Sequence, residues 1–98
     1  EVCIFLFALK VNFPAEITLL RGNHESVAMT EHFTFREEVL RKYDGDESVF
    51  DAFIEAFESM PLAADVNGDY LCMHGGISPE LTTVDDINKI DRFIEPPL

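Results

Sequence analysis

Basic residues are scarce in this chain, which carries 7 Lys and Arg against 19 Asp and Glu and has a formal net charge of −12. Nucleic acid and anionic membrane surfaces attract clustered Lys and Arg, so neither is an expected partner. Long apolar runs are also lacking. The longest, residues 2–9, falls short of the roughly 20 residues that span a bilayer, and no basic segment precedes it as in a signal peptide.

Cysteine is almost absent. Cys3 and Cys72 lie far apart in the sequence, each within an apolar run. A free cysteine commonly behaves as a small buried hydrophobic residue, and a chain without a disulfide framework is typical of a reducing compartment. We therefore expect a cytoplasmic location and leave a nuclear one open.

The length and the ends of the chain set the scale of the fold. At 98 residues, 47% of them apolar, the chain can form one small domain with a single core. It opens at Glu1 rather than at a methionine, and it stops just after Pro96 and Pro97. From these ends we expect an internal piece of a longer protein, truncated on both sides.

The first part of the chain predicts a helix and a strand. Residues 2–11 are apolar nearly all round, as in a buried helix, and Pro14 prevents its continuation. Residues 17–20 form a short apolar run between turn residues, which favours a buried strand. That strand would deliver the polar loop at residues 21–25.

Two amphipathic helices are predicted next. Thr34 and Glu37 have the spacing of a capping box, and apolar residues recur at helical intervals as far as Tyr43. A second such pattern covers residues 49–60. His32 is expected to be a packing or surface residue. The phenylalanines expected in the core are Phe33, Phe35, Phe50, Phe53 and Phe57.

The last part predicts a hairpin and a short helix. Residues 62–66 and 70–73 flank Asn67-Gly68-Asp69, and Asn-Gly is a favoured hairpin turn. Thr83 can cap a short helix that runs to about Ile90. The mixture of strands and helices favours an α/β fold, which some schemes would class as α+β.

Polar side chains suited to metals or catalysis lie in two glycine-containing loops, at residues 21–25 and 74–76, each predicted to follow a strand. The carbonyl oxygen of Asn23 and the imidazole nitrogen of His74 suit divalent ions such as Mn, Fe or Zn. Taken singly, Asn23 is more often a turn former. Glu25 and Arg21 favour structural roles, with Glu25 capping the next helix or pairing with Arg21.

The motif at residues 20–25 (LRGNHE) and the later His74-Gly75-Gly76 together resemble two signature motifs of the phosphoprotein phosphatase family. Among its members, the matches at residues 30–35 and 91–97 point to the calcineurin type. The resemblance implies that residues 1–98 are the central part of a single metallophosphoesterase catalytic domain, a β-sandwich flanked by helices. Further matches are residues 60–64 and 75–80.

The same resemblance implies a chemistry. Asn23 and His74 would be ligands of one metal in a two-metal centre, occupied by Fe and Zn or by Mn, and His24 would be the general acid. The ions would generate a hydroxide that attacks phosphorus in line with the leaving oxygen. Protonated His24 would donate to that oxygen. The expected activity is hydrolysis of phosphoserine and phosphothreonine in proteins.

Part of the family's site is missing. The GDxHG and GDxVDRG motifs do not occur in these residues, and a third histidine ligand is expected beyond Leu98. We therefore expect the parent protein to be a phosphatase, and residues 1–98 alone to be inactive and poorly folded. The sequence departs from the family pattern at residues 26–29 and at His32, which flank the site without removing a ligand.

Two rival interpretations remain open. A non-catalytic homologue that serves as a docking or regulatory module would carry the same motifs. A metallophosphoesterase acting on nucleotides or nucleic acid is disfavoured by residues 30–35 and 91–97. The partners implied by the resemblance are phosphoprotein substrates, with a calcium-binding regulatory subunit and calmodulin bound through regions outside this chain.

Overall fold

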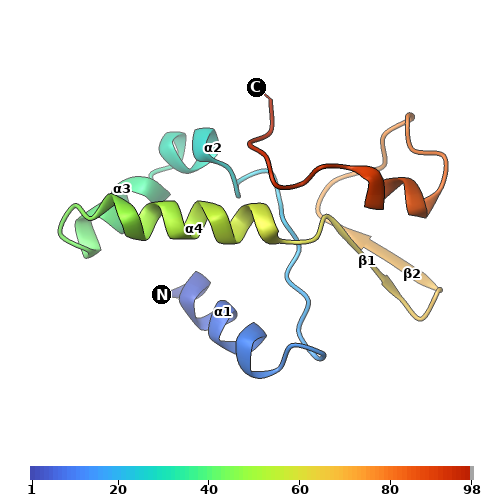
Figure 1. Cartoon of the computed structure of the whole chain (residues 1–98), viewed down its shortest axis with the longest axis horizontal. Coiled ribbons are helices and arrows are strands. Elements are labelled where there is room, and N and C mark those ends of the chain that lie inside the picture. The colour runs from blue at the N-terminus through green and yellow to red at the C-terminus, as the bar shows by residue number, and fades with distance from the viewer. Residues whose placement is uncertain (98) are drawn as a thin grey trace.

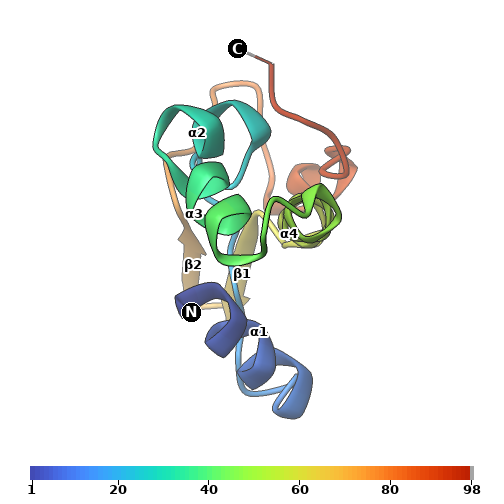
Figure 2. The ribbon, with the colours of Figure 1, turned by 90° about the vertical axis from the view of Figure 1, so that its left-hand side faces the viewer.

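The structure, a computed structural model, describes residues 1–97 and consists mainly of helices with one β-hairpin (Figure 1). In Figure 1 helix α4 runs through the middle, with α1 below it, α2 above it and the hairpin beyond its C-terminal end; Figure 2 shows α3 beside α4. The molecule measures 45 × 34 × 18 Å. The elements are α1 (Val2–Asn12), α2 (Val27–His32), α3 (Phe35–Lys42), α4 (Glu47–Ser59), β1 (Ala63–Val66), β2 (Tyr70–Met73) and the 3-10 helix η1 (Val84–Lys89).

The three predicted long helices are confirmed as α1, α3 and α4, and their ends follow from local chemistry. Asp46 caps α4 by accepting a hydrogen bond from the backbone N–H of Ser48 at 2.9 Å. Hydrogen bonds from the Ser48 hydroxyl and backbone also lower the pKa of the Asp46 carboxyl. Pro61 follows the last turn, where a continuing helix would need a backbone N–H.

A cluster of phenylalanines joins three helices and forms the centre of the core. Phe7 of α1 lies 6.2 Å from Phe53 of α4, and Phe35 of α3 meets Phe53 edge-on at 5.3 Å. Phe50 and Phe57 of α4 are buried. The predicted core role of the phenylalanines in α3 and α4 is therefore confirmed.

Helix α1 is less buried than its sequence predicts. None of its residues is fully buried, and Val2 and Val11 are 72% and 79% exposed. The helix is apolar all round, and within residues 1–97 one side of it, carrying Phe7, packs against the aromatic cluster. The apolar side chains on the other sides of α1, namely Val2, Ile4, Phe5, Leu6 and Val11, are therefore exposed to solvent.

The predicted hairpin is confirmed as β1 and β2, an antiparallel pair in which Ala63 lies opposite Met73 and Val66 opposite Tyr70. Asn67 and Gly68 both have positive φ, at 57° and 73°, as a tight hairpin turn requires. The hairpin fixes the direction in which the chain leaves Met73.

The predicted strand at residues 17–20 does not form. Within residues 1–97 the sheet contains β1 and β2 alone, so this segment has no neighbour to complete a ladder. Its first residue is engaged elsewhere: the Ile17 N–H donates to the Phe13 carbonyl, and its carbonyl accepts from Lys10 Nζ at 2.7 Å. The segment has no regular secondary structure and leads directly into the loop at residues 21–25.

Two further predictions in this region are wrong. Thr34 occupies the N-cap of α3 but has a left-handed backbone, with φ of 70°, and its side chain makes no capping bond to the helix. The expected capping box with Glu37 is therefore absent. Phe33 is 51% exposed rather than buried. It lies between α2 and α3, and the rings that it packs against, His24 and His32, are themselves exposed.

The remaining expectations concern the C-terminal helix and the cysteines. The short helix after Thr83 is confirmed as η1. Asp86 stabilises its start by accepting hydrogen bonds from the backbone N–H groups of Thr82 and Thr83. Cys3 is half-buried, but Cys72 is exposed, contrary to expectation. No helix in the described part of the chain is long and apolar enough to cross a bilayer.

Candidate functional site

The two loops that carry the candidate ligands meet in space, although they are far apart in the sequence. His74 follows β2 directly, and its Nε2 lies 2.9 Å from Oδ1 of Asn23. Both side chains are exposed. The structure thus brings together the two residues predicted to hold one metal ion.

Gly22 allows this close approach. A Cβ atom at this position would lie 3.0 Å from Cγ and Nδ1 of His74 and 2.7 Å from Oε2 of Glu25. Any side chain at residue 22 would therefore push the imidazole away. At Gly75 and Gly76, by contrast, an added Cβ would meet no atom of the described residues within 4 Å.

Arg21 is the anchor of the first loop. It is buried, and its Nε donates to the carbonyl of Glu25 at 2.8 Å. Its Nη1 donates to the carbonyls of Arg92 and Ile94, each at 3.0 Å, and its backbone N–H donates to Pro61. These bonds give Arg21 the structural role that the sequence favoured, and they join the loop to a segment about seventy residues later.

Glu25 also has a structural role, but it neither caps α2 nor pairs with Arg21 through its carboxylate. Its carboxylate accepts from the backbone N–H of Gly22 at 2.7 Å, which closes the loop on itself. Helix α2 is capped instead by Ser26, whose hydroxyl accepts from the N–H of Met29. Arg21 contacts the carbonyl of Glu25 rather than its carboxylate.

His24 lies in the same loop but makes a different contact. Its exposed imidazole stacks at a tilt on the ring of Phe33, with the centroids 4.6 Å apart. Cys3 and Glu25 line the adjacent hollow. Burial, followed by the charge of Glu25, raises the pKa of the Cys3 thiol. Packing on Phe33 orients the imidazole of His24, which remains accessible from solvent.

The Asn23–His74 pair lies on the wall of an open hollow. The hairpin and the region of η1 supply mainly apolar side chains to the rest of this hollow, so the polar pair stands out against its surroundings. Those apolar residues are Leu62, Ala63, Met73, Ile77, Leu81, Ile87 and Ile90.

The separation of the two candidate ligand atoms fits a shared ion. Ligand oxygen and nitrogen atoms at about 2.1 Å from a metal lie about 3.0 Å apart when they are at right angles on an octahedral ion, and about 3.4 Å apart on a tetrahedral one. The distance between Asn23 Oδ1 and His74 Nε2 is 2.9 Å, which is within hydrogen-bond distance and close to the octahedral value. Within residues 1–97, no group of three or more His, Cys, Asp or Glu side chains could hold an ion.

Comparison with known proteins gives consistent matches. Residues 1–98 match the family described as calcineurin-like phosphoesterase. The chain is 52% identical over 97 residues to serine/threonine-protein phosphatase 2B catalytic subunit A1 of Saccharomyces cerevisiae, and 50% identical to subunit A2. In both comparisons 99% of this chain is covered, but only 17% and 16% of the relatives.

A solved structure shares the fold. It is a protein serine/threonine phosphatase from Saccharomyces cerevisiae with similarity to human phosphatase PP5, 41% identical to this chain. The TM-score is 0.92, and the match covers 99% of this chain and 30% of the other. The predicted fold class is confirmed, and the hairpin and helices described above are a part of that larger fold.

Proposed function

The chain belongs to the calcineurin-like phosphoesterase family, and on this premise we propose that the protein containing it is a serine/threonine protein phosphatase. The chain spans about one sixth of the phosphatase 2B relatives, so the proposal concerns the whole protein. Residues 1–98 would form the central part of its catalytic domain. The observation that carries the proposal is the 2.9 Å contact between Asn23 and His74, which joins the two motifs in one site.

We propose that Asn23 and His74 hold one metal ion. An amide oxygen and an imidazole nitrogen suit Mn, Fe or Zn, and Fe with Zn or a pair of Mn ions are the combinations we favour. When bound, the ions supply positive charge for the phosphoryl oxygens and activate water. In this arrangement the backbone of Gly22 leaves room for the ring of His74 to approach Asn23.

His24 is the proposed general acid. It directly follows Asn23 in the sequence, and in the proposed arrangement it reaches the leaving oxygen of a phosphate bound at the Asn23–His74 pair. A serine or threonine alkoxide is a poor leaving group, and proton donation lowers the barrier by roughly 10²–10⁴-fold in rate. Packing on Phe33 restricts the ring, while its exposure lets it exchange protons with solvent.

The substrates, partners and location of the whole protein are also proposals. Similarity to phosphatase 2B catalytic subunits supports phosphoprotein substrates. The same similarity supports a calcium-binding regulatory subunit and calmodulin as partners, contacted outside residues 1–98. A cytoplasmic location, with the nucleus open, agrees with two free cysteines.

The proposal is tested by substituting His24→Ala in the full-length protein. We expect the variant to retain its metal, because the ligands remain, while kcat on a phosphoserine peptide falls by roughly 10²–10⁴-fold. Metal content measured by mass spectrometry and steady-state kinetics check the two parts separately.

His32→Ala is the matched control, because His32 is the other imidazole that packs on Phe33, at 4.7 Å. It should leave kcat near the wild-type value. An equal loss in both variants would show that disturbance of Phe33, not loss of a proton donor, is responsible. A metal-loaded wild-type protein without turnover would contradict the proposed function and favour a docking module.

A further inference from the structure

A segment far along the chain holds the candidate site loop from both sides. On the upstream side, the carbonyls of Arg92 and Ile94 accept hydrogen bonds from Arg21, the residue directly before Gly22. On the downstream side, Glu95 reaches the start of α2, two residues after the loop ends. We refer to residues 92–95 as the strap.

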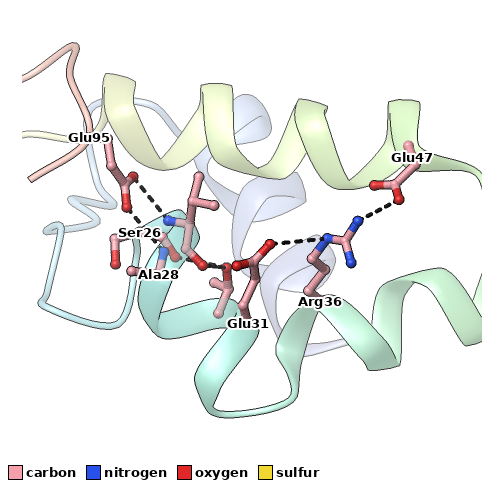
Figure 3. Close-up of polar contacts among 8 residues, drawn as sticks. Ser26, Ala28, Glu31, Arg36, Glu47 and Glu95 are labelled. Atoms are coloured by element: carbon pink, nitrogen blue, oxygen red, sulfur yellow. Dashed lines mark hydrogen bonds and ion pairs between the residues drawn. The ribbon is translucent and has the colours of Figure 1, made fainter.

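The downstream contact is a bidentate cap. Oε2 of Glu95 accepts from the backbone N–H of Val27 at 3.0 Å, and Oε1 accepts from that of Ala28 at 3.1 Å (Figure 3). These N–H groups lie in the first turn of a helix, where they have no partner within the helix. A carboxylate is favoured there because both bonds are charge-assisted and the helix dipole adds to them.

Other contacts fix the two ends of this arrangement. Arg92 donates from Nε to the carbonyl of Ser59 at 3.2 Å, which ties the strap to the end of α4. At the far end of α2, Arg36 bridges Glu31 and Glu47, as Figure 3 shows. Helix α2 is therefore held at its N-terminus by the strap and at its C-terminus by an ion-pair bridge to α4.

The loop between the two held flanks is closed mainly through side chains: the Glu25 carboxylate accepts from the Gly22 N–H at 2.7 Å, and Arg21 Nε donates to the Glu25 carbonyl at 2.8 Å. Its closing backbone bond, from Glu25 N–H to Gly22 carbonyl, is long at 3.4 Å. Asn23 and His24 are exposed. Apart from the contacts of Asn23 with His74 and of His24 with Phe33, their positions depend on Arg21 before the loop and on α2 after it, and the strap contacts both.

From this geometry we propose that Glu95 is a positioning residue for the reaction, which fixes His24 and Asn23 by anchoring the start of α2. The proposal rests on the proposed phosphatase function. Glu95 itself need not touch substrate or metal. Its loss would release the start of α2, while the bond from Arg21 Nε to the Glu25 carbonyl would remain. The imidazole of His24 would then lose part of its alignment with the leaving oxygen.

Glu95→Ala in the full-length protein tests this inference, with kinetics on a phosphoserine peptide and on p-nitrophenyl phosphate. The peptide has a poor leaving group that needs the general acid, whereas p-nitrophenolate leaves with little protonation. Misalignment of roughly 1 Å can cost up to about 10²-fold. We expect kcat on the peptide to fall about tenfold with KM unchanged, and a much smaller loss on p-nitrophenyl phosphate.

Two further variants separate positioning from general structure. Glu95→Gln keeps one acceptor oxygen and should restore part of the peptide kcat. Glu55→Ala removes the same charge from an exposed position of α4 and should match the wild type on both substrates. Equal losses on the two substrates in Glu95→Ala, or no loss on the peptide, would overturn the inference.

Amide hydrogen exchange gives a readout that does not depend on activity. In Glu95→Ala, peptides covering residues 22–28 should exchange faster than in the wild type, while those of α4 should not change. If wild-type protein hydrolyses neither substrate, the proposed function fails, and faster exchange at residues 22–28 would still show that Glu95 fixes the loop. Unchanged exchange there would overturn the positioning role whether or not the protein is active.

Discussion

The Gly22→Ala substitution tests the geometry of the candidate metal site most directly. The added methyl group would lie 3.0 Å from two atoms of the His74 ring, whereas ordinary contacts between carbon atoms are about 3.5–4.0 Å. The ring must therefore retreat by roughly 0.5 Å. The methyl group would also lie 2.7 Å from Glu25 Oε2, the atom that accepts the Gly22 N–H.

Both displacements act on metal binding. A retreat of His74 changes its separation from Asn23, which is 2.9 Å and close to that of two ligands at right angles on an octahedral ion. Displacement of the Glu25 carboxylate removes the bond that closes the loop carrying Asn23. Changes in residues that orient metal ligands typically cost 10–100-fold in affinity. We take the lower end, about tenfold or 1.4 kcal/mol, because the imidazole can partly compensate by rotation.

The measurement is Mn²⁺ affinity of the full-length protein by isothermal titration calorimetry. Gly76→Ala is the control, since it adds the same methyl group to the second loop at a point where nothing lies within 4 Å. We expect weakened binding in Gly22→Ala and unchanged binding in Gly76→Ala. Wild-type affinity in Gly22→Ala would refute the argument that close packing at residue 22 sets the ligand separation.

Two predictions concern stability. Hydrogen bonds from Lys89, and then from Thr83 and Thr82, hold the pKa of the Asp86 carboxyl well below its usual range. Because the ionised carboxylate is favoured in the folded state, Asp86 stabilises the fold at pH values above about 4, and this contribution is lost as the pH falls further. Asp86→Asn should therefore lower the urea midpoint of the full-length protein at pH 7. The difference in midpoint between variant and wild type should shrink below pH 4, and a difference that does not change with pH would contradict this reasoning. Expressed alone, residues 1–98 should bind the dye ANS and unfold without a sharp transition, because among the apolar side chains of residues 1–97 only Val39, Phe50 and Phe57 are buried. A cooperative thermal transition by circular dichroism would contradict this expectation.

Much of the helical structure was predictable because its signals are local. The three- and four-residue spacing of apolar side chains predicted α4, and Asp46 and Pro61 mark its ends. The Asn67-Gly68 turn predicted the hairpin for the same reason: both residues adopt the positive φ that the turn demands. In each case a few neighbouring residues determine the conformation.

The errors arise where distant residues decide the outcome. Residues 17–20 have the composition of a strand, but a strand forms only where a neighbour pairs with it, and the described residues provide none. Phe33 fits the helical spacing of a core residue, yet it falls at the junction of α2 and α3 and packs on imidazoles. Composition alone cannot show which neighbours a segment will have.

The candidate site shows the same division. The motifs identified Asn23 and His74, and the structure places their side chains together. Their roles as ligands, and that of His24 as general acid, stay predictions. The contacts of Gly22 with His74, and of Arg21 and Glu95 across about seventy residues, depend on tertiary structure. The family match at residues 91–97 was the one signal in the sequence that pointed to the strap.

The two proposed ligands are carried by separate structural units, and this has a consequence for how metal binding relates to folding. His74 is placed by the hairpin, whereas Asn23 is placed by a loop held through Arg21 and α2. An ion bound to both must keep the two units in their native relation, so its binding free energy adds to the stability of that arrangement. By the inference above, the strap orders the loop before the ion binds, so less conformational entropy is lost when the ion binds. The proposed positioning by Glu95 and the proposed ligation by Asn23 would therefore both favour the ordered conformation of residues 22–25 over disordered ones.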